Sequence, residues 1–270
     1  MRLPLRRGAK GSADELLDAA SLAFESGDLG RGLRLVDDAR LAASRDAESD
    51  DVVLTAWLMR AAALSEAGRF AEAEKAARAA LEVASDDVDA WDELADALFR
   101  QGRFEEAATA WEAVVDHDAA AADAWHHLGR VATWLGDHER ARRAFRRAHE
   151  LQPDEFVLPV RVAPGEFDRL ANAAWRDIPA AFRARLRNAL VVVEELPGED
   201  EVEAGTDPDI LGVYEGATAL EDDVPERIVL YQRNHEAVCG SLGELEAEIR
   251  RTVLHEVGHH FGMEDAELPY

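Results

Sequence analysis

The residues best suited to chemistry form the run HEVGH at positions 255–259. On a helix, positions four apart lie about 40° apart around the axis, so His255 and His259 can present both imidazoles to one metal ion. Glu256 lies beside such a metal without being needed as a ligand. Its carboxylate can take a proton from water on the metal and pass it to a leaving amine, while the metal lowers the pKa of that water to about 7. The run therefore predicts metal-assisted hydrolysis of a peptide bond.

A third ligand is expected shortly after this run. Gly262, three residues after His259, can end the helix in a left-handed turn and redirect the chain toward the metal. Asp265, six residues after His259, then completes a set of two imidazoles and one carboxylate. Glu264 and Glu267 remain alternative third ligands. Three protein ligands leave one tetrahedral position open for water, as in catalytic zinc sites.

A helix must carry these residues, and the preceding sequence predicts one. Ser241 followed by Glu244 has the pattern of a capping box, so we expect the helix to start there. Apolar residues at helical spacing mark the side that should be buried: Leu245, Ile249, Val253 and Val257.

Short β-rich runs precede this helix. The segments 189–193 (ALVVV) and 227–231 (RIVLY) are predicted as strands, and 211–214 (LGVY) as a weaker third. Between the first two, the acidic run 194–209 is expected to be an exposed loop.

The first half of the chain repeats every 34 residues, as Trp57, Trp91 and Trp125 show. Glycines recur eleven residues later, where a turn between helices needs positive φ, and small residues recur after them. These phases are occupied by Gly68, Gly102 and Gly136, and by Ala73, Ala107 and Ala141. The pattern resembles the tetratricopeptide repeat (TPR). The units are placed at 54–87, 88–121 and 122–155, the last closed by Pro153, with a looser unit at 13–46.

One face of the repeats is acidic. Asp89, Asp92 and Asp96 share a helix stripe, and the next unit adds Asp123 and His126. In TPR arrays this face lines a concave groove. It is either a solvated surface or a groove that selects a basic peptide.

The other histidines are not expected to bind metal. Those in the repeats are predicted surface residues: His117, His126, His127, His138 and His149. His260 is expected to neighbour the site, and His235 to lie in a loop. Tyr214 and Tyr231 lie on predicted strands, where packing is favoured over stabilisation of an oxyanion.

Composition excludes several classes of partner. Acidic residues outnumber basic ones 56 to 30, giving a net charge of −26, which repels nucleic acid and anionic membrane surfaces. No run approaches the roughly 18 apolar residues of a membrane helix, and the basic start of the chain is not followed by an apolar signal segment. Cys239 is the single cysteine, so no disulfide within the chain is expected. We therefore expect a cytoplasmic protein with a tail (1–12) and two domains, a TPR array (13–155) and a second domain (156–270).

The second domain resembles the minimal zincin-like metallopeptidases, whose motif is H-E-x-x-H-x-x-G-x-x-D. The resemblance rests on LGVYEG (211–216), RIVLYQR (227–233) and RRTVLHEVGHHFGMEDAEL (250–268). It implies a small α/β zincin fold in which a mixed sheet packs on the motif helix. It also implies His255, His259 and Asp265 as zinc ligands and Glu256 as the catalytic base.

The sequence as a whole predicts an α-solenoid of TPR helix pairs followed by a small α/β zincin-like domain. We interpret it as a zinc-dependent peptidase whose repeats recruit a protein substrate or a regulator. Extended substrate is expected to pair with the edge of the 227–233 strand. The alternative is a TPR interaction adaptor whose zincin-like domain binds metal with little turnover. Glu256 favours the enzyme, because a structural zinc site needs no base beside it.

Overall fold

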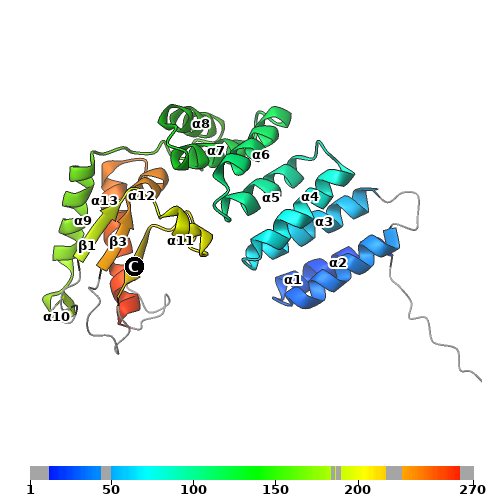
Figure 1. Ribbon diagram of the computed structural model, residues 1–270, viewed down its shortest axis with the longest axis horizontal. Helices are drawn as coiled ribbons and strands as arrows, with labels where there is room; N and C mark the ends of the chain where they lie inside the picture. The colour runs from blue at the N-terminus through cyan, green and yellow to red at the C-terminus, as the bar shows by residue number, and fades with distance from the viewer. Residues whose placement is uncertain (1–11, 44–49, 184–185, 187–189, 217–226, 262–270) are drawn as a thin grey trace, which may run out of the picture. The chain divides into compact units, whose positions relative to one another are not determined.

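The computed structural model describes residues 12–43, 50–183, 186, 190–216 and 227–261, with residues 181, 182, 259 and 260 described by their backbone alone. Contacts divide the chain into two compact units, residues 1–124 and 125–270 (Figure 1). None of the helices in the described ranges is both long and apolar enough to cross a lipid bilayer.

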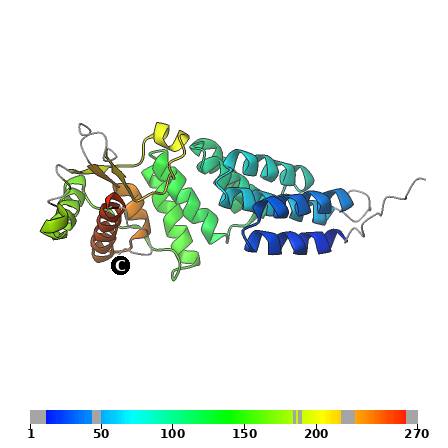
Figure 2. The ribbon, with the colours of Figure 1, turned by 90° about the horizontal axis from the view of Figure 1, so that it is seen from below.

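The first unit consists of antiparallel helix pairs. Its helices are α1 (Ala13–Glu25), α2 (Leu29–Ala43), α3 (Asp50–Glu66), α4 (Phe70–Val83), α5 (Val88–Phe99) and α6 (Phe104–His117). Each odd-numbered helix packs on the next, and α1 and α2, drawn in blue, lie side by side in Figures 1 and 2. A glycine lies in the turn between the two helices of each pair. These glycines, Gly27, Gly68 and Gly102, have φ of 76°, 70° and 74°. The expectation of left-handed turns at the repeating glycines is confirmed, because residues with a Cβ rarely adopt this φ.

Small and large side chains alternate in the core of these pairs. Ala73 and Ala107 are fully buried, and Trp111 is fully buried against Phe99, with ring centroids 5.6 Å apart. This is the packing of large residues into small ones that the repeat phases predict.

The second unit begins with one more helix pair and ends with a small α/β layer. Its helices are α7 (Ala122–Trp134), α8 (His138–Leu151), α9 (Pro164–Asp177), α10 (Ala180–Arg183), α11 (Glu199–Glu203), α12 (Gln232–Val238) and α13 (Leu242–His260). Its strands are β1 (Leu190–Glu194), β2 (Gly212–Glu215) and β3 (Arg227–Tyr231). The predicted fold class, TPR helix pairs followed by a small α/β region, is confirmed.

The three strands form one mixed sheet in the order β1-β3-β2. β3 pairs with β1 in parallel, Val192 opposite Val229, and with β2 in antiparallel orientation, Tyr214 opposite Ile228. Both edges of β3 are therefore occupied. The expectation that substrate pairs with the edge of this strand is wrong, because an extended chain can add only to an open edge.

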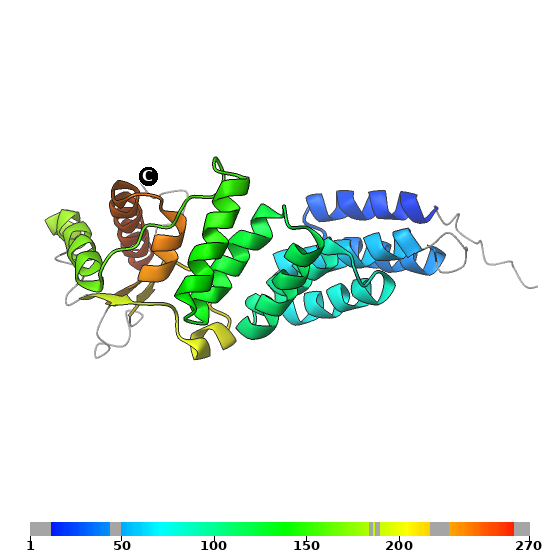
Figure 3. The same ribbon diagram turned by 90° about the horizontal axis from the view of Figure 1, so that it is seen from above.

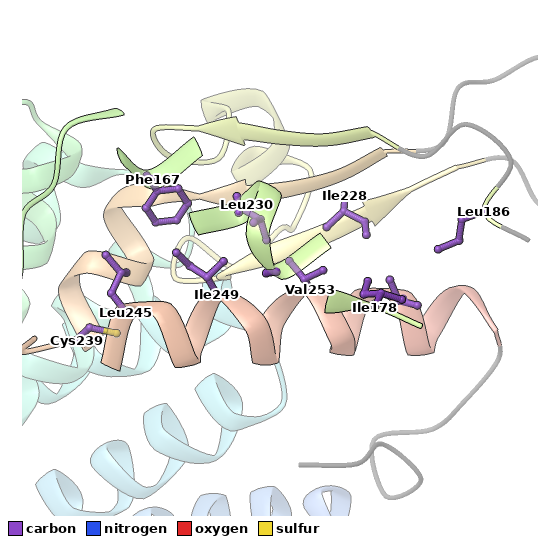
Figure 4. Packing of buried hydrophobic residues seen from close by; sticks show 12 residues of the cluster. Phe167, Ile178, Leu186, Ile228, Leu230, Cys239, Leu245, Ile249 and Val253 are labelled. Atoms are coloured by element: carbon purple, nitrogen blue, oxygen red, sulfur yellow. The ribbon is translucent and has the colours of Figure 1, made fainter. Parts of the chain in front are cut away.

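A shared hydrophobic core joins the sheet to α9 and α13. Leu245, Ile249 and Val253 point from α13 toward the sheet, where they meet Ile228 and Leu230 of β3 (Figure 4). All five side chains have 0% of their surface exposed. The predicted apolar side of the motif helix is confirmed, and this packing fixes the helix under the sheet.

Two local expectations need correction. The acidic segment 194–209 contains α11, and Val202 of this short helix is 1% exposed. His235 lies in α12 with 0% exposure, not in a loop. Both differences arise from tertiary contacts. Helices of five and seven residues are too short to show a hydrophobic period in the sequence.

Candidate active site

The motif helix α13 begins where the capping residues predict. The Ser241 hydroxyl oxygen accepts a hydrogen bond from the Glu244 N–H at 3.3 Å, and the Glu244 carboxylate accepts one from the Gly240 N–H at 2.7 Å. The helix continues to His260, so the backbones of His255 and His259 lie one helical turn apart.

Glu256 is held against the edge strand β2. Its side chain is 8% exposed, and its Oε2 accepts a hydrogen bond from the Tyr214 main-chain N–H at 2.9 Å. The Tyr231 N–H donates to the Leu211 carbonyl at 2.9 Å, so odd-numbered residues here direct their main-chain groups toward β3. Gly212 and Tyr214 consequently direct theirs to the opposite edge, on the side of Glu256; no other strand among the described residues covers this edge, which is called the open edge below.

A glycine allows this close approach of strand and helix. A Cβ on Gly212 would lie 2.8 Å from Thr252 Cγ2 and 2.9 Å from the Val229 carbonyl oxygen. No side chain fits at these distances without movement of β2 or α13. The importance of Gly212 was missed from the sequence, although a glycine inside a strand is a signal of close backbone approach.

A cavity of about 480 Å³ lies between β2 and α13. His255, half-buried, and Glu256 line it together with Gly212 and Thr252. Such a volume suits a segment of a peptide or a small ligand. The structure therefore brings the first histidine of the motif and the predicted base into one cavity, beside an open strand edge.

The remaining predicted ligands lie outside what the structure describes. His259 is described by its backbone alone, and Asp265 falls outside the described residues, as do the alternatives Glu264 and Glu267. Within the described part of the chain, no three His, Cys, Asp or Glu side chains are grouped closely enough to hold a metal.

His235 contacts α13 through Thr252, which lines the cavity. Its Nδ1 lies 2.9 Å from the Tyr231 carbonyl, which can only accept, so Nδ1 carries the proton. Its Nε2 lies 3.1 Å from the Thr252 hydroxyl, which also contacts the Glu248 carbonyl at 3.0 Å. Burial lowers the pKa of His235 to about 4, so the ring is neutral at pH 7, and its Nε2 is an acceptor that competes with the Glu248 carbonyl for the single Thr252 hydroxyl proton. This contact orients the threonine that packs on Gly212.

The two tyrosines of the sheet behave as packing residues. Tyr231 is 1% exposed, and its hydroxyl lies 3.5 Å from a Glu201 carboxylate oxygen. Burial, with nearby carboxylates, raises its pKa. The Tyr214 ring packs against the core shared by the sheet and α13. What Tyr214 presents toward Glu256 is its main-chain N–H.

Comparison with known families agrees with this architecture. Residues 186–270 match the family described as zincin-like metallopeptidase, and residues 58–111 and 93–156 match the tetratricopeptide repeat. The chain joins tetratricopeptide repeats to a zincin-like region. The predicted order of the two is confirmed. No curated protein matches the chain.

Several solved repeat proteins resemble part of the chain. The MamA protein is 18% identical, with a TM-score of 0.47, over 52% of this chain and 73% of that one. YrrB, a TPR protein with an unusual peptide-binding site, is 21% identical, with a TM-score of 0.36, over 53% and 88%. The first TPR of Spaghetti (RPAP3), bound to an HSP90 peptide, is 19% identical, with a TM-score of 0.41, over 46% and 96%. No function is transferred from these, since every TM-score is below 0.5.

The acidic face of the repeats differs in detail from the expectation. Asp89 and Asp123 are exposed, but Asp92 is half-buried, and its Oδ1 accepts the Trp111 indole N–H at 2.8 Å. Asp96 accepts the Ser65 hydroxyl proton at 2.9 Å. Asp92 and Asp96 therefore also hold the helices together.

The carboxylates of this face raise one another's pKa. Burial raises the pKa of Glu93 to about 7, and repulsion from Asp92, Asp96 and Asp89 adds to the shift. The pKa of Asp92 is raised too, by burial and by the neighbouring aspartates. Glu93 was not singled out from the sequence. The shifts show that the carboxylates of this face repel one another.

Of the repeat histidines, His117 and His138 are exposed as predicted, and the others are less exposed than predicted. His126 and His127 are half-buried. The His126 ring lies among aromatic rings, 4.9 Å from Phe156 and 5.3 Å from Phe145 between centroids. Burial, then the Arg130 charge, lowers the pKa of His126 to about 4. His149 Nδ1 contacts the Phe156 carbonyl at 2.7 Å. The prediction of surface histidines is wrong for His126, because the segment after α8 folds back over its ring.

Proposed function

We propose that the chain is a zinc-dependent peptidase in which Glu256 acts as the general base. The observation that carries the proposal is the shared cavity of His255 and Glu256 at the open edge of β2. An adaptor that merely bound metal would need neither a buried carboxylate in the cavity nor an open strand edge beside it.

The residues of the motif suit zinc. Two imidazoles and one carboxylate are a ligand set of catalytic zinc sites. His255 lines the cavity, and α13 continues without a break past His259, which keeps the spacing that two ligands on one helix need. His255, His259 and Asp265 would hold the ion. Bound zinc would polarise the carbonyl under attack and lower the pKa of water to about 7.

The chain's own groups supply positioning and proton transfer. The outward main-chain groups of Gly212 and Tyr214 can pair with an extended substrate and lay its backbone along the cavity. Glu256, 8% exposed, is shielded from bulk water and can take a proton from the attacking water and deliver it to the leaving amine. A substrate strand on β2 would compete with Glu256 for the Tyr214 N–H, so binding would release the carboxylate for this role.

The test is Glu256→Gln, which preserves size and removes the base. Cleavage of a mixed peptide library, followed by mass spectrometry, should slow by roughly 10² to 10⁴-fold, while zinc content stays unchanged. Glu248→Gln is the matched control, because Glu248 lines the same cavity on the same helix and pairs with Arg251. An unchanged rate for Glu256→Gln, or an equal loss for Glu248→Gln, would contradict the assigned role.

We further propose that the repeats, residues 13–155, recruit a protein substrate or a regulator for the peptidase domain, residues 156–270. The support is the acidic face. Exposed Asp89 and Asp123 offer negative charge to a basic segment of a partner protein, and the positive charge of such a segment would favour ionised Glu93, whose pKa is raised to about 7. Such a contact would add the selectivity that main-chain pairing at β2 lacks.

A further inference from the structure

A second cavity, of about 430 Å³, lies within residues 125–270 and away from the motif helix. It is bounded by α8 and the start of α12, drawn green and orange in Figure 3. On α8 the residues His138, Arg142, Phe145 and Arg146 line it. Their spacing of four, three and one places them on one side of the helix, so the lining is a continuous helical face.

The opposite wall comes from the segment that follows α8 and from α12. Leu158, Pro159 and Arg161 lie on the segment, and Arg233 on α12. Leu158 is 46% exposed. With Pro159 it gives the cavity an apolar surface, to which Phe145, 2% exposed, adds a small part, while the guanidinium groups surround it.

The charges around the cavity do not cancel. Arg161 and Arg233 both contact the carboxylate of Glu236, which is 0% exposed, at 2.6 and 3.0 Å. Arg233 also contacts Glu195 at 2.5 Å, and Arg142 pairs with Glu139. No carboxylate that the structure describes lies within ion-pair distance of Arg146.

Four guanidinium groups therefore meet three carboxylates, and one positive charge is left over. This excess stands out in a chain of net charge −26. A single excess charge matches a monoanion better than a dianionic phosphate. An arginine fork binds the two oxygens of a carboxylate in one plane.

We propose that this cavity binds a carboxylate joined to a compact apolar group. The carboxylate contacts Arg146, and the apolar group packs on Leu158 and Pro159. The cavity volume lies in the range of small-molecule sites. Such a ligand is either a free organic acid or the carboxyl end of a peptide, and the two share the same chemistry.

The experiment is isothermal titration calorimetry of the full chain with two acids and their neutral amides. Hexanoate and hexanamide represent the free acid, and N-acetyl-phenylalanine and its amide represent a peptide end. We expect at least one acid to bind at one site per chain and to bind at least about tenfold more tightly than its amide, a difference of about 1.4 kcal/mol. The acid that binds more tightly identifies the source. Affinity should fall with added salt, because the guanidinium groups are partly exposed.

Variants locate the site. Arg146→Glu should weaken binding about tenfold or more, whereas Arg143→Glu, an exposed arginine on α8 outside the cavity, should leave it unchanged. Leu158→Ser should weaken both acids while keeping every charge. Circular dichroism checks folding, and Arg146→Gln repeats the test without charge reversal. The proposal is overturned if neither acid binds below about 10 mM, if amides bind as well as acids, or if Arg146→Glu and Arg143→Glu behave alike.

Discussion

Replacing Gly212 by alanine tests the packing that brings β2 to Glu256. The new methyl group would meet Thr252 Cγ2 at 2.8 Å and the Val229 carbonyl oxygen at 2.9 Å. Overpacking of this kind costs about 1 to 3 kcal/mol. Alanine regains roughly 0.5 to 1 kcal/mol over glycine in a strand. The two ranges combine to a net loss of about 0 to 2.5 kcal/mol in the free energy of unfolding, centred on about 1 kcal/mol, with β2 displaced from the helix.

Urea denaturation of the full chain measures this loss, and peptide cleavage should fall with it because the Tyr214 N–H moves. Gly243→Ala is the matched control, since a Cβ on Gly243, in the first turn of α13, meets nothing within 4 Å. Thr252→Ser removes Cγ2 but keeps the hydroxyl that contacts His235, so adding it to Gly212→Ala should restore part of the stability. Equal stability of Gly212→Ala and Gly243→Ala would refute the close packing of β2 on α13.

Three further predictions address the metal, the repeats and acid stability. We expect about one zinc per chain by elemental analysis, with zinc lost on His255→Ala or His259→Ala and bound more weakly by Asp265→Ala. Zinc should also bind less tightly near pH 6, because the histidines protonate there. Full zinc content in both histidine variants would rule out these ligands. Reversing exposed Asp89 and Asp123 to lysine should remove the preference for a protein substrate over short peptides at unchanged zinc content. That preference should also weaken with salt, since the screening length is about 8 Å at physiological ionic strength, and unaltered selectivity would contradict recruitment. The pKa of His126 is about 4 in the fold, against about 6.5 when unfolded, so the unfolded chain binds the proton first and stability is lost as pH falls from about 6.5 to 4. His126→Phe should remove that loss, about 2 kcal/mol at pH 5, and an unchanged difference between denaturation at pH 7 and pH 5 would disprove it.

Features set by local spacing could be predicted from the sequence. The repeating glycines predict turns because glycine adopts positive φ without steric cost, and Gly68 and Gly102 have positive φ. Likewise, the burial of Leu245 and Val253 follows from helical period alone. The run HEVGH predicted a helix, which α13 confirms, and the structure adds that His255 and Glu256 line one cavity.

Features set by distant contacts could not be predicted. Apolar β-branched runs identified the strands, yet nothing in the run RIVLY says that it lies between the other two. Strand order depends on pairing between segments far apart in sequence. For the same reason His235 was assigned to a loop. Its burial depends on Thr252, 17 residues away, and on a helix of seven residues with no detectable period.

The strand order also sets when each part of the protein can fold. β1 and β2 share no ladder, because β3, the last strand along the part of the chain that the structure describes, separates them. The helix pairs of the repeats join neighbouring segments and can close as soon as each pair has left the ribosome. The sheet must wait for β3, and the cavity must wait for α13 after it. A nascent chain therefore carries folded repeats before it has an assembled cavity, which delays any proteolytic activity until α13 has been synthesised.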